Sequence, residues 1–492
     1  MKKILIANRG EIAVRIIRTC REMGIVTMAV ASDADAQSLH AELADECYLI
    51  GPAPVSESYL RGDKIIEIAL QHGADAIHPG FGFLSENAGF ARAVKDAGLI
   101  FIGPEPNVIE TMGSKQKSKR LMIQAGVPTV PGYTGDRQDG EHLLEEAKKI
   151  GFPVLIKASA GGGGKGMRIV HSADRFIEEL ETARREAKSA FGDDVVLLEK
   201  YLTRPRHIEF QVFGDSHGNV VHLFERECSI QRRHQKILEE TPSTAMTPQL
   251  RKAMGQAAVA AATSSGYTNA GTVEFMLDED GSFYFLEMNT RLQVEHPITE
   301  MLTGLDLVRW QILVALGRPL PCKQEEITAR GHSIEVRVYA EDPQRNFFPQ
   351  TGRIVRYIEP EGLGLRIDSG IREGDEISIF YDPMVSKLIA WGATREEACQ
   401  KLSNALEEYC VHGVKTNMAF LKAIIGEPHF IKGDIATDYL EKHFKEFSEP
   451  DELVDWALAL TAMAGTGMSQ KQSTVARVVD PWERLSSWRG GQ

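Results

Sequence analysis

The feature that most constrains this chain is a run of polar residues at alternate positions that begins at Glu287. The sequence from residue 287 to 297 reads EMNTRLQVEHP, and the preceding FYFL has the aromatic and aliphatic character of a strand. Side chains of a β-strand point alternately to its two faces. If the whole run is extended, one face carries the following side chains: Glu287, Asn289, Arg291, Gln293 and Glu295. This row predicts a catalytic strand.

A second carboxylate, Glu274, lies in the apolar run GTVEFML, which is followed by DEDG, a sequence typical of a hairpin turn. A turn centred between Asp280 and Gly281 would place Glu274 directly opposite Glu287. Facing like charges are destabilising, so we expect the pair to be neutralised by a proton or by a cation. Mg²⁺ is the natural candidate, because it is a hard ion that prefers carboxylate oxygens. An exposed hairpin with solvated charges is the alternative, but it does not explain the polar row.

A glycine-rich loop is the second strong feature. The sequence FPVLIKASAGGGGKGMRIV places the glycines 161–164 between two strand-like runs. Glycines let backbone N–H groups approach phosphate oxygens, and Lys157 and Lys165 add positive charge. The loop does not follow the P-loop pattern. A mobile linker is the alternative, although linkers are seldom bracketed by apolar strands that carry lysines.

The N-terminal segment has the pattern of an open parallel α/β domain. Residues 3–7 are predicted to form a strand, residues 11–23 an amphipathic helix, and residues 25–31 a second strand. This βαβ order predicts a parallel sheet. The segment lacks G-x-G-x-x-G, so a nicotinamide cofactor is not expected.

Composition is that of a large soluble enzyme and argues against several other classes. The chain has 492 residues, of which 43% are hydrophobic, so it can form several domains. Its net charge of −13 argues against nucleic acid as a partner. The six cysteines have no C-x-x-C spacing, and no apolar stretch approaches the length of a membrane span. We expect a cytoplasmic protein, although a mitochondrial protein that has lost its presequence would look similar.

Six motifs in a fixed order carry a resemblance to a known family. The chain resembles biotin carboxylase, the ATP-grasp component of biotin-dependent carboxylases, from residue 1 to about residue 445. The matching motifs are IANRGEIA (6–13), HPGFGFLSEN (78–87), the glycine loop, ECSIQRRHQK (227–236), EMNTRLQVEH (287–296) and YDPMVSKL (381–388).

The resemblance and the changes of pattern together predict the domain organisation. The fold class is α/β: an ATP-grasp fold with an N-terminal open parallel α/β domain and a C-terminal mixed α/β domain. The expected parts are the N-terminal domain (1–113), the ATP-grasp domain (114–330) with a lid that holds the glycine loop (131–202), the C-terminal domain (331–445) and a helical or linker tail (446–492).

Nucleotide and metal contacts are implied by the same resemblance. The hinge at the end of the lid, residues 199–202, would present backbone and side-chain groups to adenine, and lysines and glycines would contact the phosphates. The expected ATP contacts are Lys115, Lys157, Gly161, Gly162, Gly163, Gly164, Glu199, Lys200, Tyr201, Leu202, His207, Gln231 and His234. The expected ligands of Mg²⁺, or of Mn²⁺ in its place, are Glu274, Glu287 and Asn289.

The resemblance also implies a pocket for bicarbonate and biotin, formed by Lys236, Arg291, Gln293, Val294, Glu295, Arg337 and Phe81. Glu295 would be the general base, which takes the bicarbonate proton so that the oxygen attacks the γ-phosphate. Arg337 would stabilise the enolate of the biotin ureido group. An ion pair with Glu335 is the alternative role for Arg337. Phe81 replaces a tyrosine found in many relatives, which removes one hydroxyl near the expected biotin site.

The absence of a biotin-attachment motif and the sequence of the tail both indicate partner proteins. Biotin is normally attached to lysine in an Ala-Met-Lys-Met type motif, and no Met-Lys-Met occurs here. We therefore expect biotin to arrive on a carrier protein or on a downstream domain, with a carboxyltransferase subunit and a homodimer as further partners. The sequence DPWERLSSWR at 480–489 resembles the junction in acyl-CoA carboxylase α-subunits. It favours a piece or relative of such a longer subunit over a standalone subunit, and a pyruvate carboxylase component is the second candidate.

Two other function classes remain as alternatives. Another ATP-grasp ligase, acting on a carboxylate and an amine, would share Glu274, Glu287 and the glycine loop. It would not need the set of Lys236, Arg291, Gln293, Glu295 and Arg337. A non-catalytic nucleotide-binding scaffold would have lost at least one metal or base residue, and none is lost.

Overall fold

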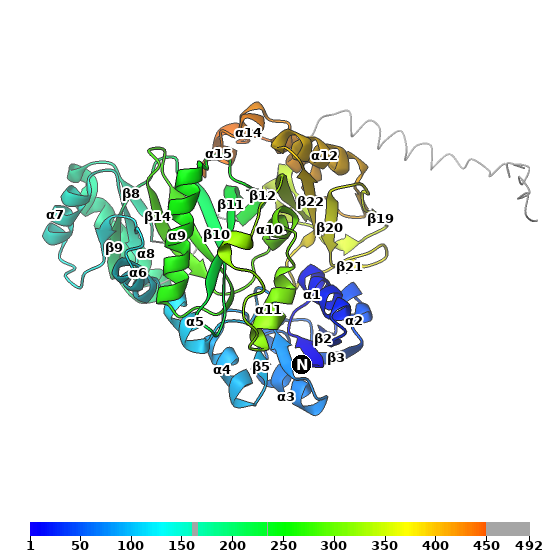
Figure 1. Ribbon diagram of the computed structural model, residues 1–492. Coiled ribbons are helices and arrows are strands. Elements are labelled where there is room, and N and C mark those ends of the chain that lie inside the picture. Colours follow the sequence, from blue (N-terminus) through cyan, green and yellow to red (C-terminus); the bar gives the residue numbers. More distant parts are fainter. Residues whose placement is uncertain (160–165, 234, 449–492) are drawn as a thin grey trace, which may run out of the picture. The chain divides into compact units, whose positions relative to one another are not determined.

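The computed structural model describes residues 1–159, 166–233 and 235–448 (Figure 1). The chain divides into two units, Met1–Glu446 and Phe447–Gln492, and the fold below is that of the first unit. Nearly all of the predicted tail, and the four glycines of the loop, lie outside the described residues. In the part of the chain that the structure covers, no helix is both long enough and apolar enough to cross a membrane.

The N-terminal part is a five-stranded parallel sheet with the order β3-β2-β1-β4-β5. Its opening β1-α1-β2 unit confirms the predicted βαβ pattern. The strands are β1 (Lys3–Ile6), β2 (Val26–Ser32), β3 (Glu46–Gly51), β4 (Ala76–His78) and β5 (Ile100–Phe101). The helices are α1 (Gly10–Glu22), α2 (Leu39–Leu43), α3 (Gly62–Gln71) and α4 (Ala88–Asp96).

The predicted lid region has a four-stranded antiparallel sheet of its own, with the order β6-β9-β7-β8. β7 and β8 form a hairpin, so strands do bracket the glycine loop as the sequence predicts. The strands are β6 (Gly132–Tyr133), β7 (Val154–Ala158), β8 (Arg168–Val170) and β9 (Val196–Lys200). The helices from α5 to α8 are α5 (Pro106–Gly113), α6 (Lys115–Gln124), α7 (Gly140–Ile150) and α8 (Phe176–Phe191). α7 and α8 bury their apolar faces on this sheet in a separate small core.

The largest sheet of the first unit has eight antiparallel strands in the order β14-β13-β10-β11-β12-β15-β22-β20. Figure 1 labels β14, β10, β11, β12, β22 and β20 among these strands. The sheet joins strands from the predicted ATP-grasp domain to strands from the predicted C-terminal domain, because β12 pairs with β15. The strands are β10 (Arg206–Gly214), β11 (Val220–Arg232), β12 (Gln235–Thr241), β13 (Asn269–Leu277), β14 (Phe283–Asn289), β15 (His332–Tyr339), β20 (Leu365–Ser369) and β22 (Met384–Gly392).

Helices cover this sheet, and three separate two-stranded sheets lie in the described C-terminal part of the chain. α9 packs on β10, β11 and β13 over an apolar core, which leaves the opposite face of these strands for polar side chains. The helices are α9 (Pro248–Ser264), α10 (His296–Thr303), α11 (Leu307–Ala315), α12 (Arg395–Glu408), α13 (Met418–Ile425), α14 (Pro428–Lys432) and α15 (Tyr439–His443). The short strands are β16 (Glu341–Asp342), β17 (Phe348–Pro349), β18 (Gly352–Arg353), β19 (Arg356–Ile358), β21 (Glu376–Ile377) and β23 (Cys410–His412).

The β13–β14 hairpin has the predicted register at the carboxylates but not at the turn. Glu274 lies opposite Glu287, as predicted. Near the turn, however, Leu277 pairs with Phe283, so the turn is centred on Asp280 rather than between Asp280 and Gly281. A bulge between these two stretches shifts the pairing by one residue, and the predicted pairing holds only beyond it.

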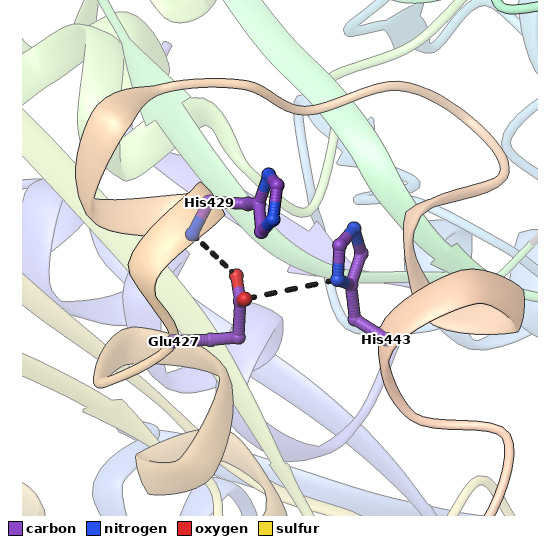
Figure 2. Close-up of side chains that lie close together, drawn as sticks. All are labelled: Glu427, His429 and His443. Atoms are coloured by element: carbon purple, nitrogen blue, oxygen red, sulfur yellow. Dashed lines mark hydrogen bonds and ion pairs between the residues drawn. The ribbon is translucent and has the colours of Figure 1, made fainter.

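The last two short helices are tied together by Glu427. Its carboxylate accepts hydrogen bonds from the backbone N–H groups of His429 (2.7 Å) and Phe430 (3.0 Å) and from the Tyr439 hydroxyl (2.6 Å). One carboxylate oxygen lies 3.7 Å from Nδ1 of His443 (Figure 2). Glu427 therefore caps α14 and also anchors α15.

Replacing Glu427 by alanine should destabilise this corner by about 1–2 kcal/mol, because a helix cap is lost. Hydrogen exchange of the amides in α14 and α15 should become faster, while exchange in β10 stays unchanged. Glu441→Ala is the matched control, since Glu441 is an exposed carboxylate on α15. Equal exchange in the two variants would show that Glu427 does not hold the helices together.

Candidate active site

The predicted row of polar side chains does not continue along one strand. β14 ends at Asn289, residues 290–295 form an irregular loop, and α10 begins at His296. The extended run through Glu295 is therefore wrong. Two features explain the end of the strand. Glu86 accepts a hydrogen bond from the backbone N–H of Thr290 (3.0 Å). Pro297 lies in the first turn of α10, where its fixed φ favours the start of a helix.

The 290–295 loop nevertheless brings the predicted side chains together. Arg291 donates to the side chains of Gln293 (3.0 Å) and Asn289 (3.3 Å), and Gln293 donates to Glu274 (3.1 Å). Arg291 is also held by Glu86 at 2.9 Å. The polar groups converge because the loop folds back across the end of the hairpin, rather than because they share a strand face.

Lys236, on β12, lies among three carboxylates. Its Nζ is 2.6 Å from Glu209, 2.9 Å from Glu274 and 2.7 Å from Glu295. Burial alone would lower the pKa of Lys236, but these three charges raise it well above its usual value. Lys236 is therefore a fixed positive charge among three carboxylates.

Glu295 is fully buried between two cations. Lys236 lies on one side, and Arg337 Nη2 is 3.0 Å from its other oxygen. Burial would raise the pKa of Glu295, but the charges of Lys236 and Arg337 hold it well below its usual value. Its carboxylate is therefore ionised at neutral pH and can accept a proton.

Arg337 bridges Glu295 and a second carboxylate, Glu239 (2.5 Å). Burial raises the pKa of Glu239 to about 7, although the guanidinium of Arg337 opposes this effect. Glu335 was the expected alternative partner of Arg337, but the described residues show no such ion pair. The arginine is therefore directed towards the general-base candidate.

The two opposed carboxylates of the hairpin have different surroundings. Burial would raise the pKa of Glu274, but Lys236 and His207, whose Nε2 is 2.9 Å away, lower it. Glu287 makes no hydrogen bond or ion pair with any described residue, and its pKa is raised by desolvation and by the charge of Glu274. An unpaired carboxylate beside an ionised one fits a divalent cation.

The other predicted contacts near this pair are placed as follows. The amide nitrogen of Asn289 donates to Glu274 (2.8 Å), so its oxygen faces Arg291 rather than the two carboxylates. Gln231 Nε2 donates to Nδ1 of His207 (2.6 Å), which leaves the His207 proton on Nε2, facing Glu274. His234 lies outside the described residues.

At the nucleotide end, Glu199 on β9 forms ion pairs with Lys157 and with Lys119 (2.8 Å). Burial would raise the pKa of Glu199, but these two lysines lower it. The backbone N–H groups of Lys200 and Tyr201 are bonded to Pro131 and Pro153 of the lid. Hydrogen bonds thus join the hinge to two other segments of the lid. Leu202, the last hinge residue, is buried.

Two further predicted site residues, Lys115 and Phe81, make none of the side-chain contacts described above. Lys115 opens α6, and its charge lowers the pKa of Glu287, which places it on the side of the hairpin carboxylates. Phe81 is partly buried against a core that α1 and β1 share with residues from β10 to α11, and its backbone carbonyl accepts a hydrogen bond from Asn8 (2.7 Å).

Sequence reasoning missed residues that the sheet brings to the site from a distance. Glu209 pairs with Glu274 across β10 and β13, and Arg226 pairs with Glu209 across β11 and β10. The row Arg226, Glu209, Glu274, Glu287 therefore crosses four strands. Only the hairpin pair is local in sequence, so no local pattern could have found the other two. The other missed residues are Glu86, Lys119 and Glu239; of these, only Glu86 lies in one of the six sequence motifs.

Comparison with known families covers most of the chain. Residues 1–109 match biotin carboxylase, N-terminal domain; residues 114–323 match the carbamoyl-phosphate synthase L chain, ATP binding domain; and residues 335–442 match the biotin carboxylase C-terminal domain.

Curated relatives fall into two groups of different length. The α-subunit of methylcrotonoyl-CoA carboxylase from Dictyostelium discoideum, named as mitochondrial, is 52% identical over 99% of this chain and 70% of its own length. A biotin carboxylase from Halalkalibacterium halodurans is 54% identical over 90% of this chain and 98% of its own length. The chain spans 60 to 70% of the length of the methylcrotonoyl-CoA carboxylase α-subunits it matches.

A solved structure agrees with this grouping. The biotin carboxylase domain dimer of 2-oxoglutarate carboxylase from Hydrogenobacter thermophilus, in complex with MgADP, ADP and bicarbonate, superposes with a TM-score of 0.84. It is 49% identical and covers 91% of this chain and 99% of its own. That protein binds a nucleotide, a metal and bicarbonate within the same fold.

Proposed function

The chain belongs to the biotin carboxylase family, and from that premise we propose that it carboxylates biotin with bicarbonate and ATP through carboxyphosphate. The observation that carries the proposal is the buried Glu295, held ionised between Lys236 and Arg337 next to the Glu274–Glu287 pair. A base, two cations and an anionic pair in one site are the groups that this reaction needs.

The first step is proton transfer from bicarbonate. Lys236 and Arg291 bind the anion, and the planar guanidinium of Arg291 suits bidentate contact with it. Glu295 accepts the proton, and the resulting oxygen attacks the γ-phosphorus of ATP. The bond from phosphorus to the bridging oxygen breaks, so ADP leaves and carboxyphosphate remains.

The nucleotide is held by the lid and by the hairpin. Lys115, Lys157 and the glycine loop contact the phosphates, so Lys157 has to exchange part of its pairing with Glu199 for ATP. Mg²⁺ or Mn²⁺, held by Glu274 and Glu287 with Asn289 alongside, neutralises phosphate charge when bound. Closing of the lid over ATP excludes water from carboxyphosphate.

The second step transfers the carboxyl group to biotin. Carboxyphosphate breaks down to CO₂ and phosphate, the phosphate removes the proton from N1 of the ureido group, and N1 attacks CO₂. Arg337 stabilises the negative charge that develops on the ureido oxygen. Phe81 contributes ring contact near this group but no hydroxyl.

Partners and setting follow from the relatives. The similarity to methylcrotonoyl-CoA carboxylase α-subunits favours a role in an acyl-CoA carboxylase, with pyruvate carboxylase as the second candidate. The proposed partners are a biotin carrier protein or domain, a carboxyltransferase subunit and a second copy of the chain, as in the dimeric neighbour. A cytoplasmic location stays a prediction, because several relatives are named as mitochondrial.

Release of ADP by the purified chain tests this function. With ATP and Mg²⁺, ADP release should require bicarbonate and should increase when free biotin is added. A ligase acting on another carboxylate and amine would show neither dependence, and a scaffold would bind nucleotide without turnover. Absence of bicarbonate-dependent turnover in a folded sample would overturn the proposal.

A further inference from the structure

Two of the six sequence motifs have no role in the mechanism above, and the structure brings them together. Glu11 lies in IANRGEIA on α1, and Lys387 lies in YDPMVSKL on β22. Their side chains are 3.1 Å apart, and both are buried. The place where they meet is the underside of the 290–295 loop.

Lys387 makes one contact that a simple ion pair would not need. Its Nζ donates to the backbone carbonyl of Val294 at 2.9 Å. Val294 directly precedes Glu295 in the 290–295 loop. The lysine therefore joins β22 to the peptide bond that carries the general base.

The loop has few other anchors that fix this peptide. Residues 290–295 form no strand ladder, because β14 has already ended at Asn289. Glu86 fixes the start of the loop at Thr290, and Gln293 is held through its carbonyl by Nδ1 of His296 at 2.7 Å. At Val294 the hydrogen bond from Lys387 is the long-range anchor.

Lys387 has two roles, the ion pair with Glu11 and the hydrogen bond to the Val294 carbonyl, and the neighbouring charges allow them to be tested separately. Asp368 is 3.7 Å from Lys387, but it already accepts two hydrogen bonds from Arg366 (2.9 and 2.7 Å). Glu11, at 3.1 Å, is thus the paired carboxylate of Lys387, and buried Glu335 acts on the same charge without an ion pair. The charges of Glu11 and Lys387 can be removed together. Lys387 also lies directly opposite Arg337 in the pairing of β22 with β15.

We propose that Lys387 is a positioning residue for the bicarbonate step: through the Val294 carbonyl it fixes the 294–295 peptide, so that the Val294 N–H and the Glu295 carboxylate face bicarbonate together. The proposal deepens the proposed function and rests on it. Loss of this anchor removes no side chain that contacts substrate, but it lets the 294–295 peptide move, and the base moves with it. A misplacement of about 1 Å is enough to slow a reaction by about a hundredfold.

The test compares Lys387→Met with the double variant Glu11→Gln/Lys387→Met. The single variant leaves Glu11 buried without a counter-ion, so it should be less stable. The double variant removes both charges, so its thermal midpoint should return towards that of the wild type. Its turnover should stay about a hundredfold low, with a raised KM for bicarbonate and an unchanged Kd for an ATP analogue.

Lys401→Met is the matched control. Lys401 also donates to a backbone carbonyl, that of Trp391 (3.1 Å), and pairs with a glutamate, Glu397 (2.8 Å), but it lies on α12. Its loss should not change the KM for bicarbonate. Hydrogen exchange within residues 290–295 should become faster in the double variant only, which gives a readout that does not depend on turnover.

The outcomes are distinct. A double variant that regains both stability and bicarbonate turnover, with wild-type exchange in the 290–295 loop, would show that Lys387 is only half of a structural ion pair. Failure of the proposed function would appear earlier, as a wild-type chain without bicarbonate-dependent turnover. In that case the exchange measurement would still decide whether Lys387 fixes the loop.

Discussion

Replacing Glu295 by glutamine is expected to slow bicarbonate-dependent ADP release by a factor of about 10²–10⁴, the usual contribution of a general base. Glutamine has nearly the same shape but cannot accept the proton. The fold should survive the change, because each neighbouring cation keeps another carboxylate. Lys236 retains Glu209 and Glu274, and Arg337 retains Glu239.

Binding of an ATP analogue provides the control for this variant. Its Kd should match that of the wild type within about threefold, because Glu295 makes no hydrogen bond or ion pair with those predicted nucleotide residues that the structure describes. Turnover should be measured over a range of bicarbonate concentrations, so that weaker binding and slower chemistry are separated. A loss of less than tenfold at saturating bicarbonate would mean that another group takes the proton.

The second large effect concerns stability. Arg226 is fully buried, and its guanidinium donates to Glu209 (2.5 Å), Gln211 (2.9 Å) and Thr299 (3.0 Å). Arg226→Met should destabilise the largest sheet by about 3–5 kcal/mol, because it leaves a buried carboxylate without this partner. Native-state hydrogen exchange of amides in β10 and β11 measures the change.

Two further variants make this prediction specific. Arg226→Met/Glu209→Gln removes both charges and should recover part of the lost stability. Arg61→Ala breaks an exposed pair with Asp63 and should change stability by less than about 0.5 kcal/mol. If Arg226→Met resembled Arg61→Ala, the buried arginine would not be needed to neutralise the site.

Local patterns predicted those parts of the fold that depend on neighbouring residues. The βαβ opening and the strands around the glycine loop follow from periodicity within short windows, and the structure confirms both. The pairing of Glu274 with Glu287 was also predictable, because a short turn limits the register of a hairpin. The turn was predicted between Asp280 and Gly281, but it is centred on Asp280. A bulge in the hairpin shifts the pairing by one residue, which restores the predicted partners at the carboxylates.

The sequence patterns could not predict contacts between residues that are far apart in the chain. The alternating pattern predicted that the polar row extends to Glu295. The pattern could not show that Glu86, about 200 residues earlier in the chain, accepts a hydrogen bond from the backbone N–H of Thr290 and ends the strand. The same limit hid Glu209 and Arg226, whose relation to the hairpin depends on the order of strands in the sheet. The family resemblance identified Arg337, but it could not show that Arg337 pairs with Glu239 rather than with Glu335.

The pairing of β12 with β15 means that the C-terminal strands complete the catalytic sheet rather than stand beside it. A fragment that stopped near residue 330 would leave β12 as a bare edge, with a row of unpaired N–H and C=O groups open to other chains. Lys236 would then stand on the outermost strand, and Glu295 would lose Arg337. The part of the chain that carries the predicted ATP contacts is thus chemically unfinished until residues far downstream have been synthesised and paired.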